Sequence, residues 1–241
     1  MCIRDRVQDN LIALEWGRWL AYDKQYVLEA SGYNKISSIN NGLENAGIGE
    51  LLDAFSEKLI LYQDANYAKH YRKIMDSVSA QFGDTIISQK SAKALFRAMA
   101  IKDEYEVARL MLSPTFEQTL KSKFGNSRPS SYYLAPPFLS FLKDANGFPR
   151  KVRFGSWVRT IFWVLTKLKS LRGTAFDPFA HSRERKLEVS FRAALITKLS
   201  NPKKLMQMPE KLGAQLDAAL NVKGYGHVKK KSLEAAILAL N

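Results

Sequence analysis

Apolar residues recur at steps of three and four along most of the chain, which is the spacing of helices that bury one face. The first such helix is predicted between Asp9 and Tyr22. The apolar stripe that we expect it to bury consists of Leu11, Ile12, Trp16, Trp19 and Leu20. Residues 31–49 are rich in Gly, Ser and Asn, so they predict a loop or linker.

The central part of the chain predicts a run of further helices. They cover residues 50–78, 86–100, 103–112 and 113–124. The first is long for a globular protein, and its polar step at residues 63–66 indicates a break. The last is predicted to begin at Ser113-Pro114, because serine is a good N-cap and proline at the first helical position gives up no backbone hydrogen bond.

Residues 125–153 interrupt the helical pattern with four prolines and two glycines. We interpret them as a long ordered loop that contains two short extended segments, at residues 132–134 and 151–154. Loops of this length inside compact chains usually serve a function or an interface.

Helical periodicity returns in the C-terminal part of the chain. The predicted elements are a helix over 156–171, a turn-rich connector over 172–180, helices over 182–199 and 209–220, a tight turn at 224–227 and a short helix over 232–240. The apolar side of the first of these helices is formed by Trp157, Ile161, Leu165 and Leu168. The expected fold class is therefore mainly α, a multi-helix domain with a long Pro-rich loop and at most a short β-hairpin.

The composition, with 46% hydrophobic and 25% charged residues among 241, is that of a globular protein. The single cysteine, Cys2, excludes a disulfide framework and an iron–sulfur cluster held by this chain alone, and the three scattered histidines argue against a metal site. No apolar run approaches the length of a membrane span, so we expect a cytoplasmic protein. The opening MCIRDR fits neither a cap nor the periodicity and resembles translated adapter sequence, so we interpret residues 1–6 as a non-native leader.

Positive charge is concentrated in the C-terminal part. The chain has a formal net charge of +14, and residues 150–241 hold 19 basic and 6 acidic residues. With Trp157, Trp163 and Tyr225, such a surface could bind nucleic acid, and the basic helix around Trp157 could lie on an anionic membrane. The cations are spread over several elements, with one run at Lys229–Lys231 and no helix-turn-helix signature, so we favour a solvated or interfacial basic surface.

Few residues suggest catalytic chemistry. Asp103, Glu104 and Glu106 bring three carboxylates together, but acidic residues in the first turn of a helix favour its dipole, so we interpret them as structural. His227 lies in the Gly-rich segment GYGHVKK, where a capping role is commoner than a ligand contact. No nucleotide-binding, hydrolase or zinc-protease signature occurs, so we assign no catalytic residue and no metal ligand.

The loop segment YYLAPPF offers two adjacent aromatic rings, Tyr132 and Tyr133, and a stiff Pro-Pro pair. It could contact a ligand, but such a segment more often packs a loop onto a domain surface. Whether the loop 125–153 or His227 reaches an active site stays open from the sequence.

Five segments in order resemble the C-terminal region of the long, fused indolepyruvate ferredoxin oxidoreductases of bacteria. They are AIKDEYEVARL at 100–110, YLAPP at 133–137, FGSW at 154–157, LRGTAFDPF at 171–179 and GYGHV at 224–228. Residues 10–20, with EWGR at 15–18, resemble the last helix of that family's gamma-type catalytic domain. The resemblance covers nearly all of the chain from Val7, although residues 200–220 carry no motif that matches.

The resemblance implies an enzyme whose reacting parts lie outside this chain. The complete enzymes use thiamine diphosphate with Mg to decarboxylate aryl pyruvates, pass the acyl group to coenzyme A and send electrons through 4Fe-4S clusters to ferredoxin. The thiamine-binding Gly-Asp-Gly pattern is absent here, since Gly83-Asp84 is followed by Thr85, and the cluster cysteines are absent too. Cofactor-binding residues are therefore unknown, and we expect no cofactor in this chain.

These inferences lead to one hypothesis and one alternative. We expect residues 7–49 to be the end of a gamma-type catalytic domain with its linker, and 50–241 to be a C-terminal helical domain without an assigned role. That domain would be structural or offer a docking face, and the chain alone would be inactive. Its partners would be the upstream catalytic domains of the same polypeptide, with ferredoxin and coenzyme A as further candidates and no membrane. The alternative is a free-standing basic helical module that binds nucleic acid.

Overall fold

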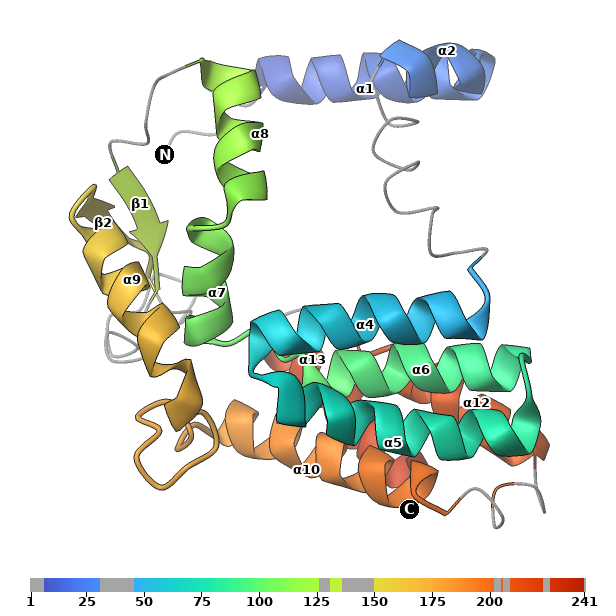
Figure 1. Cartoon of the computed structure of the whole chain (residues 1–241). Helices are drawn as coiled ribbons and strands as arrows, with labels where there is room; N and C mark the ends of the chain where they lie inside the picture. The colour runs from blue at the N-terminus through green and yellow to red at the C-terminus, as the bar shows by residue number, and fades with distance from the viewer. Residues whose placement is uncertain are drawn as a thin grey trace. The chain divides into compact units, whose positions relative to one another are not determined.

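The computed structural model describes residues 7–30, 46–125, 131–135, 150–201, 205, 209–222 and 226–240. Over these residues the chain is mainly helical, with one antiparallel pair of short strands, which confirms the expected fold class (Figure 1). It divides into two compact units, Met1–Glu50 and Leu51–Asn241. No helix in the described part is long and apolar enough to cross a membrane.

The first unit contains α1 (Val7–Tyr22) and α2 (Lys24–Ala30). The sequence predicted α1 but missed α2, which begins because the Asp23 carboxylate accepts a hydrogen bond from the Tyr26 backbone N–H at 2.9 Å. The expectation that α1 buries its apolar stripe is wrong for the chain as it stands. The exposed fractions of the five stripe residues lie between 41% and 54%. Residues 31–45 of the predicted linker lie outside the described residues.

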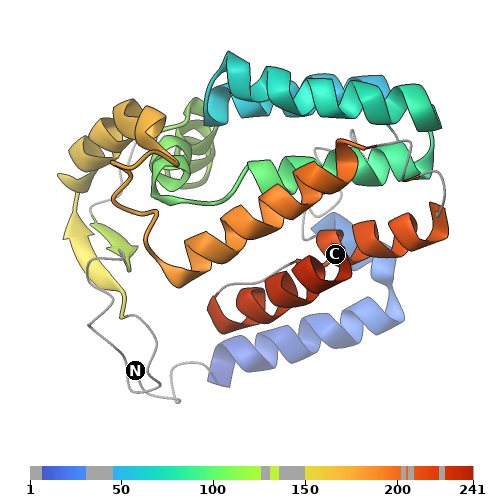
Figure 2. The ribbon, with the colours of Figure 1, turned by 90° about the horizontal axis from the view of Figure 1, so that it is seen from below.

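Six helices of the second unit form what we call the bundle. They are α4 (Ile48–Tyr62), α5 (Ala65–Phe82), α6 (Ile86–Met99), α10 (Arg183–Leu199), α12 (Pro209–Leu220) and α13 (Gly226–Leu240). Helix α6 packs against α5, α10 and α12, and α13 packs against α10 and α12 (Figure 2). The largest fully buried side chains of the core include Leu51, Leu59, Tyr71, Met75, Leu95, Met99, Leu195, Leu199, Leu212 and Leu216.

The predicted break in the long N-terminal helix of the bundle is confirmed. Helix α4 ends at Tyr62, and α5 starts anew after Asp64, whose carboxylate accepts from the Tyr67 backbone N–H at 2.8 Å. Helix α5 then ends at Gly83, whose φ of 65° lies in the left-handed region that favours glycine.

The remaining elements of the second unit form a small lobe. They are α7 (Glu104–Met111), α8 (Pro114–Phe124), β1 (Ser131–Leu134), β2 (Val152–Gly155), α9 (Val158–Lys167) and the 3-10 helix η3 (Leu168–Leu171). Its core consists of Ala108, Tyr132, Val158 and Phe162. The two predicted extended segments pair as strands, with Tyr132 opposite Phe154, and Ser113 caps α8 as predicted by accepting from the Phe116 backbone N–H at 3.2 Å. Residues 136–149 of the long loop lie outside the described residues.

Two predictions in the C-terminal part are wrong in detail. Helix α9 buries Val158 and Phe162, whereas Trp157, Ile161 and Leu168 of the predicted apolar side are 40% to 58% exposed. Helix α13 begins at Gly226 instead of Ser232, so the backbone of Gly226 and His227 is helical and not part of a turn. The lysine run 229–231 is part of this helix, and the Lys230 ammonium lies 3.9 Å from the carboxylate of Glu234, one helical turn further on.

Candidate functional site

Two of the five segments that carry the resemblance meet at one buried ion pair. Arg172 lies in the connector after η3, and Asp103 lies immediately before α7. The guanidinium donates to both carboxylate oxygens, Nε to Oδ2 at 2.5 Å and Nη2 to Oδ1 at 3.0 Å. The two side chains are only 10% and 2% exposed, so this is a bidentate pair shielded from water.

The other donors of Arg172 bind the end of α4. Nη1 donates to the backbone carbonyl of Tyr62 at 2.7 Å and to the Gln63 side-chain oxygen at 2.6 Å. The guanidinium carbon also lies 3.7 Å from the centre of the Tyr62 ring, in cation–π geometry. The Tyr62 hydroxyl in turn donates to Asp103 Oδ2 at 3.3 Å. We call this group, Arg172 with Asp103, Tyr62 and Gln63, the Arg172 junction.

The connector that carries Arg172 is itself held by a second buried carboxylate. Asp177 accepts from the backbone N–H groups of Gly173 at 2.9 Å and Phe179 at 3.0 Å, and from the Tyr105 hydroxyl at 3.2 Å. Gly173 has a φ of 75°, which a residue with a Cβ adopts only with strain. The sequence RGTAFDPF therefore makes a rigid turn around the Asp177 side chain.

Burial sets the protonation of the groups in this region. It raises the pKa of Tyr62 and of Tyr105 well above the usual value for a phenol, so both hydroxyls stay protonated and donate. Burial alone would lower the pKa of Arg172, but the hydrogen bonds to Asp103 and the neighbouring negative charges outweigh it, and the pKa is raised. The junction thus consists of the charged pair Arg172–Asp103 and the neutral phenol of Tyr62, and the neutral phenol of Tyr105 binds the neighbouring Asp177.

The three clustered carboxylates each bind a different arginine. Asp103 pairs with Arg172, and its Oδ1 also accepts from the Glu106 backbone N–H at 2.8 Å, which makes it the N-cap of α7. Glu106 pairs with Arg109 at 2.6 Å, and Glu104 pairs with Arg185 of α10 at 3.3 Å. Burial raises the pKa of Glu104, although Arg185 and a backbone hydrogen bond act in the opposite direction. This arrangement is one of ion pairs and a helix cap, not of an acid and a base aimed at a common point.

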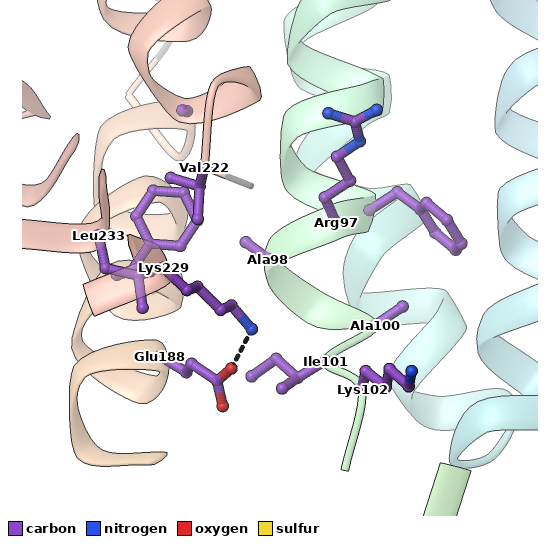
Figure 3. A pocket seen from close by; sticks show the side chains of 12 residues that line it. Arg97, Ala98, Ala100, Ile101, Lys102, Glu188, Val222, Lys229 and Leu233 are labelled. Carbon is purple, nitrogen blue, oxygen red and sulfur yellow. Dashed lines mark hydrogen bonds and ion pairs between the residues drawn. The ribbon is translucent and has the colours of Figure 1, made fainter. Parts of the chain in front are cut away.

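A chain of alternating charges leads from Glu104 to a cleft. Arg185 also contacts Glu188 at 3.1 Å, and Lys229 of α13 donates to the other carboxylate oxygen of Glu188. Figure 3 shows the Lys229 ammonium pointing to this carboxylate at one end of the cleft, with Ile101 beside it.

The cleft has a volume of about 460 Å³ and lies among α6, α10, α12 and α13. Its walls are mostly apolar, and they include Ala98, Ile101, Phe191, Val222 and Leu233. This volume and lining are typical of sites for small molecules. Both oxygens of Glu188 are bonded to cations, so this carboxylate is not placed to act as a base in the cleft.

The residues singled out from the sequence do not converge on one site. Tyr132 is buried in the lobe core, where its hydroxyl accepts from Arg159 Nη1 at 3.4 Å, whereas the neighbouring Tyr133 is 64% exposed. The side chain of His227 and all of Tyr225 lie outside the described residues. In the described part no three His, Cys, Asp or Glu side chains gather closely enough to hold a metal ion.

Several cations of the C-terminal part form ion pairs or hydrogen bonds within the chain. Besides the pairs already described, Arg159 pairs with Glu117, Lys169 donates to the Leu61 carbonyl at 3.0 Å and Lys198 donates to the Leu240 carbonyl at 2.8 Å. Sequence reasoning missed this, and it missed Arg172 as the centre of a buried network. The available signal was the segment RGTAFD, in which a basic residue, a glycine and a carboxylate follow one another within six positions.

Comparison with known protein families places most of the chain in one family. The model of a family described as a family of unknown function, DUF6537, matches residues 48–240, which contain the whole bundle and the lobe. No curated protein and no solved structure shows significant similarity to the chain.

Proposed function

The chain belongs to the DUF6537 family, whose function is unknown, and with this as our premise we propose that it is the C-terminal helical portion of an enzyme like the indolepyruvate ferredoxin oxidoreductases. Within that enzyme it has a structural and docking role and performs none of the chemistry. The observation that carries the proposal is the Arg172 junction, which joins the segments 100–110 and 171–179.

The junction supports a structural role because its polar groups are bonded to one another. Arg172 has partners in Asp103, Tyr62 and Gln63, and Asp177 has partners in its own turn and in Tyr105. A site built to bind a substrate directs donors or acceptors toward a cavity. Here the motif residues have packing partners instead, so their presence in the two segments is explained by the fold they hold together.

The exposed apolar side chains of α1 support the docking part of the proposal. Trp16, Trp19 and Leu20 are 41% to 45% exposed, and Leu11 is 54% exposed. A row of large apolar side chains left in water marks a surface that contacts another protein part. In the proposed enzyme this helix packs within a gamma-type catalytic domain, as the resemblance of residues 10–20 implies.

The proposal places the cofactors outside this chain. Thiamine diphosphate with Mg, the 4Fe-4S clusters and the sites for coenzyme A and ferredoxin would belong to catalytic domains upstream in the same polypeptide. The enzyme would act in the cytoplasm on aryl pyruvates, and the 241-residue chain by itself would have no oxidoreductase activity.

The test combines a gene and an assay. We expect the DNA upstream of the codon for Val7 to continue in frame and to encode thiamine-binding and Cys-rich segments. The longer protein should then reduce a dye with an aryl pyruvate and coenzyme A, whereas the purified 241-residue chain should not. Turnover by the short chain, or an authentic start codon with a ribosome-binding site at this point, would overturn the proposal.

A further inference from the structure

The outer face of α9 carries a row of exposed apolar side chains. Trp157 just before the helix, Ile161 and Val164 within it, and Leu168 just after it follow one another at steps of four, three and four, and their exposed fractions are 58%, 43%, 42% and 40%. Trp163, beside this row on the same helix, is 57% exposed as well. On the inner side of the same helix Val158 and Phe162 are 2% and 4% exposed. The helix is thus apolar on two sides, and the lobe covers only one of them.

The spacing of the outer row indicates what kind of surface would cover it. Steps of four, three and four are the spacing of the seam along which two helices pair, and such a seam is narrower than the apolar face of a helix that packs on a whole domain. Such a row can pack against the apolar row of a second helix, which is how proteins bind amphipathic helices.

The charge around the row indicates the sign of the partner. Residues 150–176 contain seven basic residues and no acidic residue. Three of them have partners within the chain: Arg159 binds Glu117, Lys169 binds the Leu61 carbonyl and Arg172 binds Asp103. The other four basic residues, all exposed, are Arg150, Lys151, Arg153 and Lys167. An exposed apolar row within such a segment fits a partner that carries carboxylates beside its own apolar row.

We propose that the outer face of α9 is the docking site for an acidic amphipathic helix of a partner protein. The apolar row of that helix covers Trp157, Ile161, Val164 and Leu168, and its flanking carboxylates pair with the basic residues of the segment 150–167. The inference deepens the proposed docking role and rests on it. A second copy of this chain is a poor occupant, because two basic faces repel each other. An anionic membrane is the competing occupant of an exposed face that contains tryptophan and lies near cations in the sequence, and the vesicle experiment below distinguishes it from a helix.

A pair of designed peptides tests the proposal with the 241-residue chain. One labelled helical peptide of about 21 residues has Leu along a 4-3-4 row and Glu at the flanking positions, and the second has Lys in place of Glu. Fluorescence anisotropy should show that the acidic peptide binds at least about tenfold more tightly than the basic one. Raising the salt concentration from about 0.05 to about 0.3 M should weaken this binding several-fold, since the flanking charges are exposed.

Substitutions on the face locate the binding. The double variant Ile161→Asp with Val164→Asp places two carboxylates in the exposed row, and it should weaken binding of the acidic peptide by about tenfold or more. The double variant Ile86→Asp with Leu238→Asp is the matched control, because these side chains are 70% and 79% exposed on α6 and α13, outside α9, and the two changes add the same charge. The control variant should bind as the original chain does, and circular dichroism should show equal helix content in both variants.

Several outcomes would overturn the proposal. These are no binding of the acidic peptide, equal binding of both peptides, or binding that the double variant leaves unchanged. Flotation with vesicles of phosphatidylcholine and about 30% phosphatidylserine, lost in the double variant while the peptides fail to bind, would assign the face to a membrane instead. A dimer of the chain that the double variant abolishes would assign it to a second copy. Absence of peptide binding alongside an active longer enzyme removes only this inference. Absence of an upstream coding continuation removes the proposed function together with the place of this face in that enzyme, and peptide binding then tests the face by itself.

Discussion

Arg172, the cation of the Arg172 junction, and the outer face of α9 lie within one stretch without acidic residues, 150–176, and their environments are opposite. At the junction a cation is buried and fully bonded to the protein. On α9, large apolar side chains are left in water and cations lie exposed in the neighbouring sequence. The difference teaches that the basic character of this stretch has two separate causes, one internal to the fold and one directed outward.

Loss of the Arg172 junction should lower the free energy of unfolding more than any other change considered. Arg172→Leu leaves the Asp103 carboxylate buried without its cation and also releases the end of α4. Breaking a buried pair from one side is expected to lower the free energy of unfolding by about 3 to 5 kcal/mol. Urea unfolding followed by circular dichroism measures this. Arg172→Lys is the matched variant, and it should recover part of the loss because it keeps the charge but not the two-pronged geometry. A loss below about 1 kcal/mol for Arg172→Leu would show that the junction is not important to the fold.

The next largest effect should be the difference in stability between substitutions on the buried and the exposed side of α9. Phe162 and Ile161 are neighbours in sequence, but they are 4% and 43% exposed. Phe162→Ala should lower the free energy of unfolding by about 3 kcal/mol or more, because it opens a cavity in the lobe core. Ile161→Ala should change it by less than about 1 kcal/mol. Thermal unfolding of both variants, compared with the original chain, checks the contrast, and equal losses would mean that the outer face is covered within the chain.

A smaller effect should come from Glu104 and depend on pH. Burial raises the pKa of Glu104 in the folded protein above the ordinary value of 4.5. The folded state therefore holds its proton more tightly than the unfolded state, and the stability that this proton contributes is lost as the pH rises from below 4.5 through the raised value. Glu104→Gln should remove this part of the pH dependence. Midpoints of thermal unfolding for both proteins between about pH 4 and pH 7 measure the difference, and parallel curves would contradict the assignment.

The weakest of the expected effects is the binding of nucleic acid by the chain. Arg159, Arg172 and Arg185 pair with carboxylates, and Lys169 and Lys198 donate to backbone carbonyls, so these five side chains already have partners within the chain and are less available to phosphates. We expect a labelled DNA duplex or single strand to show at most weak binding at about 0.05 M salt. Tight binding whose affinity falls steeply with salt would instead favour the nucleic-acid-binding alternative, and it would make the outward cations part of that site.

The helix boundaries that the sequence predicts well are those marked by a local cap. Ser113 and Ser182 both precede a helix and accept from a backbone N–H three residues later, and such patterns are visible within four residues of sequence. The break at residues 63–66 could be predicted for the same reason, because Asp64 is the N-cap of α5. The two short strands follow from short runs of apolar and aromatic residues between turn-forming residues.

The buried side of α9 could not be predicted in this way. The helix has one apolar row at Trp157, Ile161, Val164 and Leu168 and another at Val158, Phe162 and Leu165. Periodicity identifies both rows but cannot say which one meets the rest of the lobe, since this depends on where α7 and the strands lie. The predicted apolar side took Trp157, Ile161 and Leu168 from the first row and Leu165 from the second, and the structure exposes the three residues from the first row.

The candidate site was the least predictable part. Arg172 and Asp103 are 69 residues apart in sequence, and no local pattern indicates which of the many carboxylates a given arginine will bind. The cleft at Glu188 and Lys229 likewise depends on four helices that come together only in the folded chain. The sequence did indicate that the carboxylates at 103–106 start a helix, which is the local part of their role.

The chain crosses between the bundle and the lobe twice, entering at Asp103 and leaving at Arg172, and the bidentate pair fastens the two crossings to each other. The lobe is also bonded to the bundle by the Glu104–Arg185 pair and by the hydrogen bond from Lys169 to the Leu61 carbonyl, so the bidentate pair is the most buried of several attachments. A protease cut in the connector after Arg172 should leave the two fragments associated, because the bidentate pair and the contacts of Tyr62 and Gln63 do not depend on the continuity of the chain there. Force applied to α9 by a bound partner would reach α7 through their direct packing and α4 through Arg172.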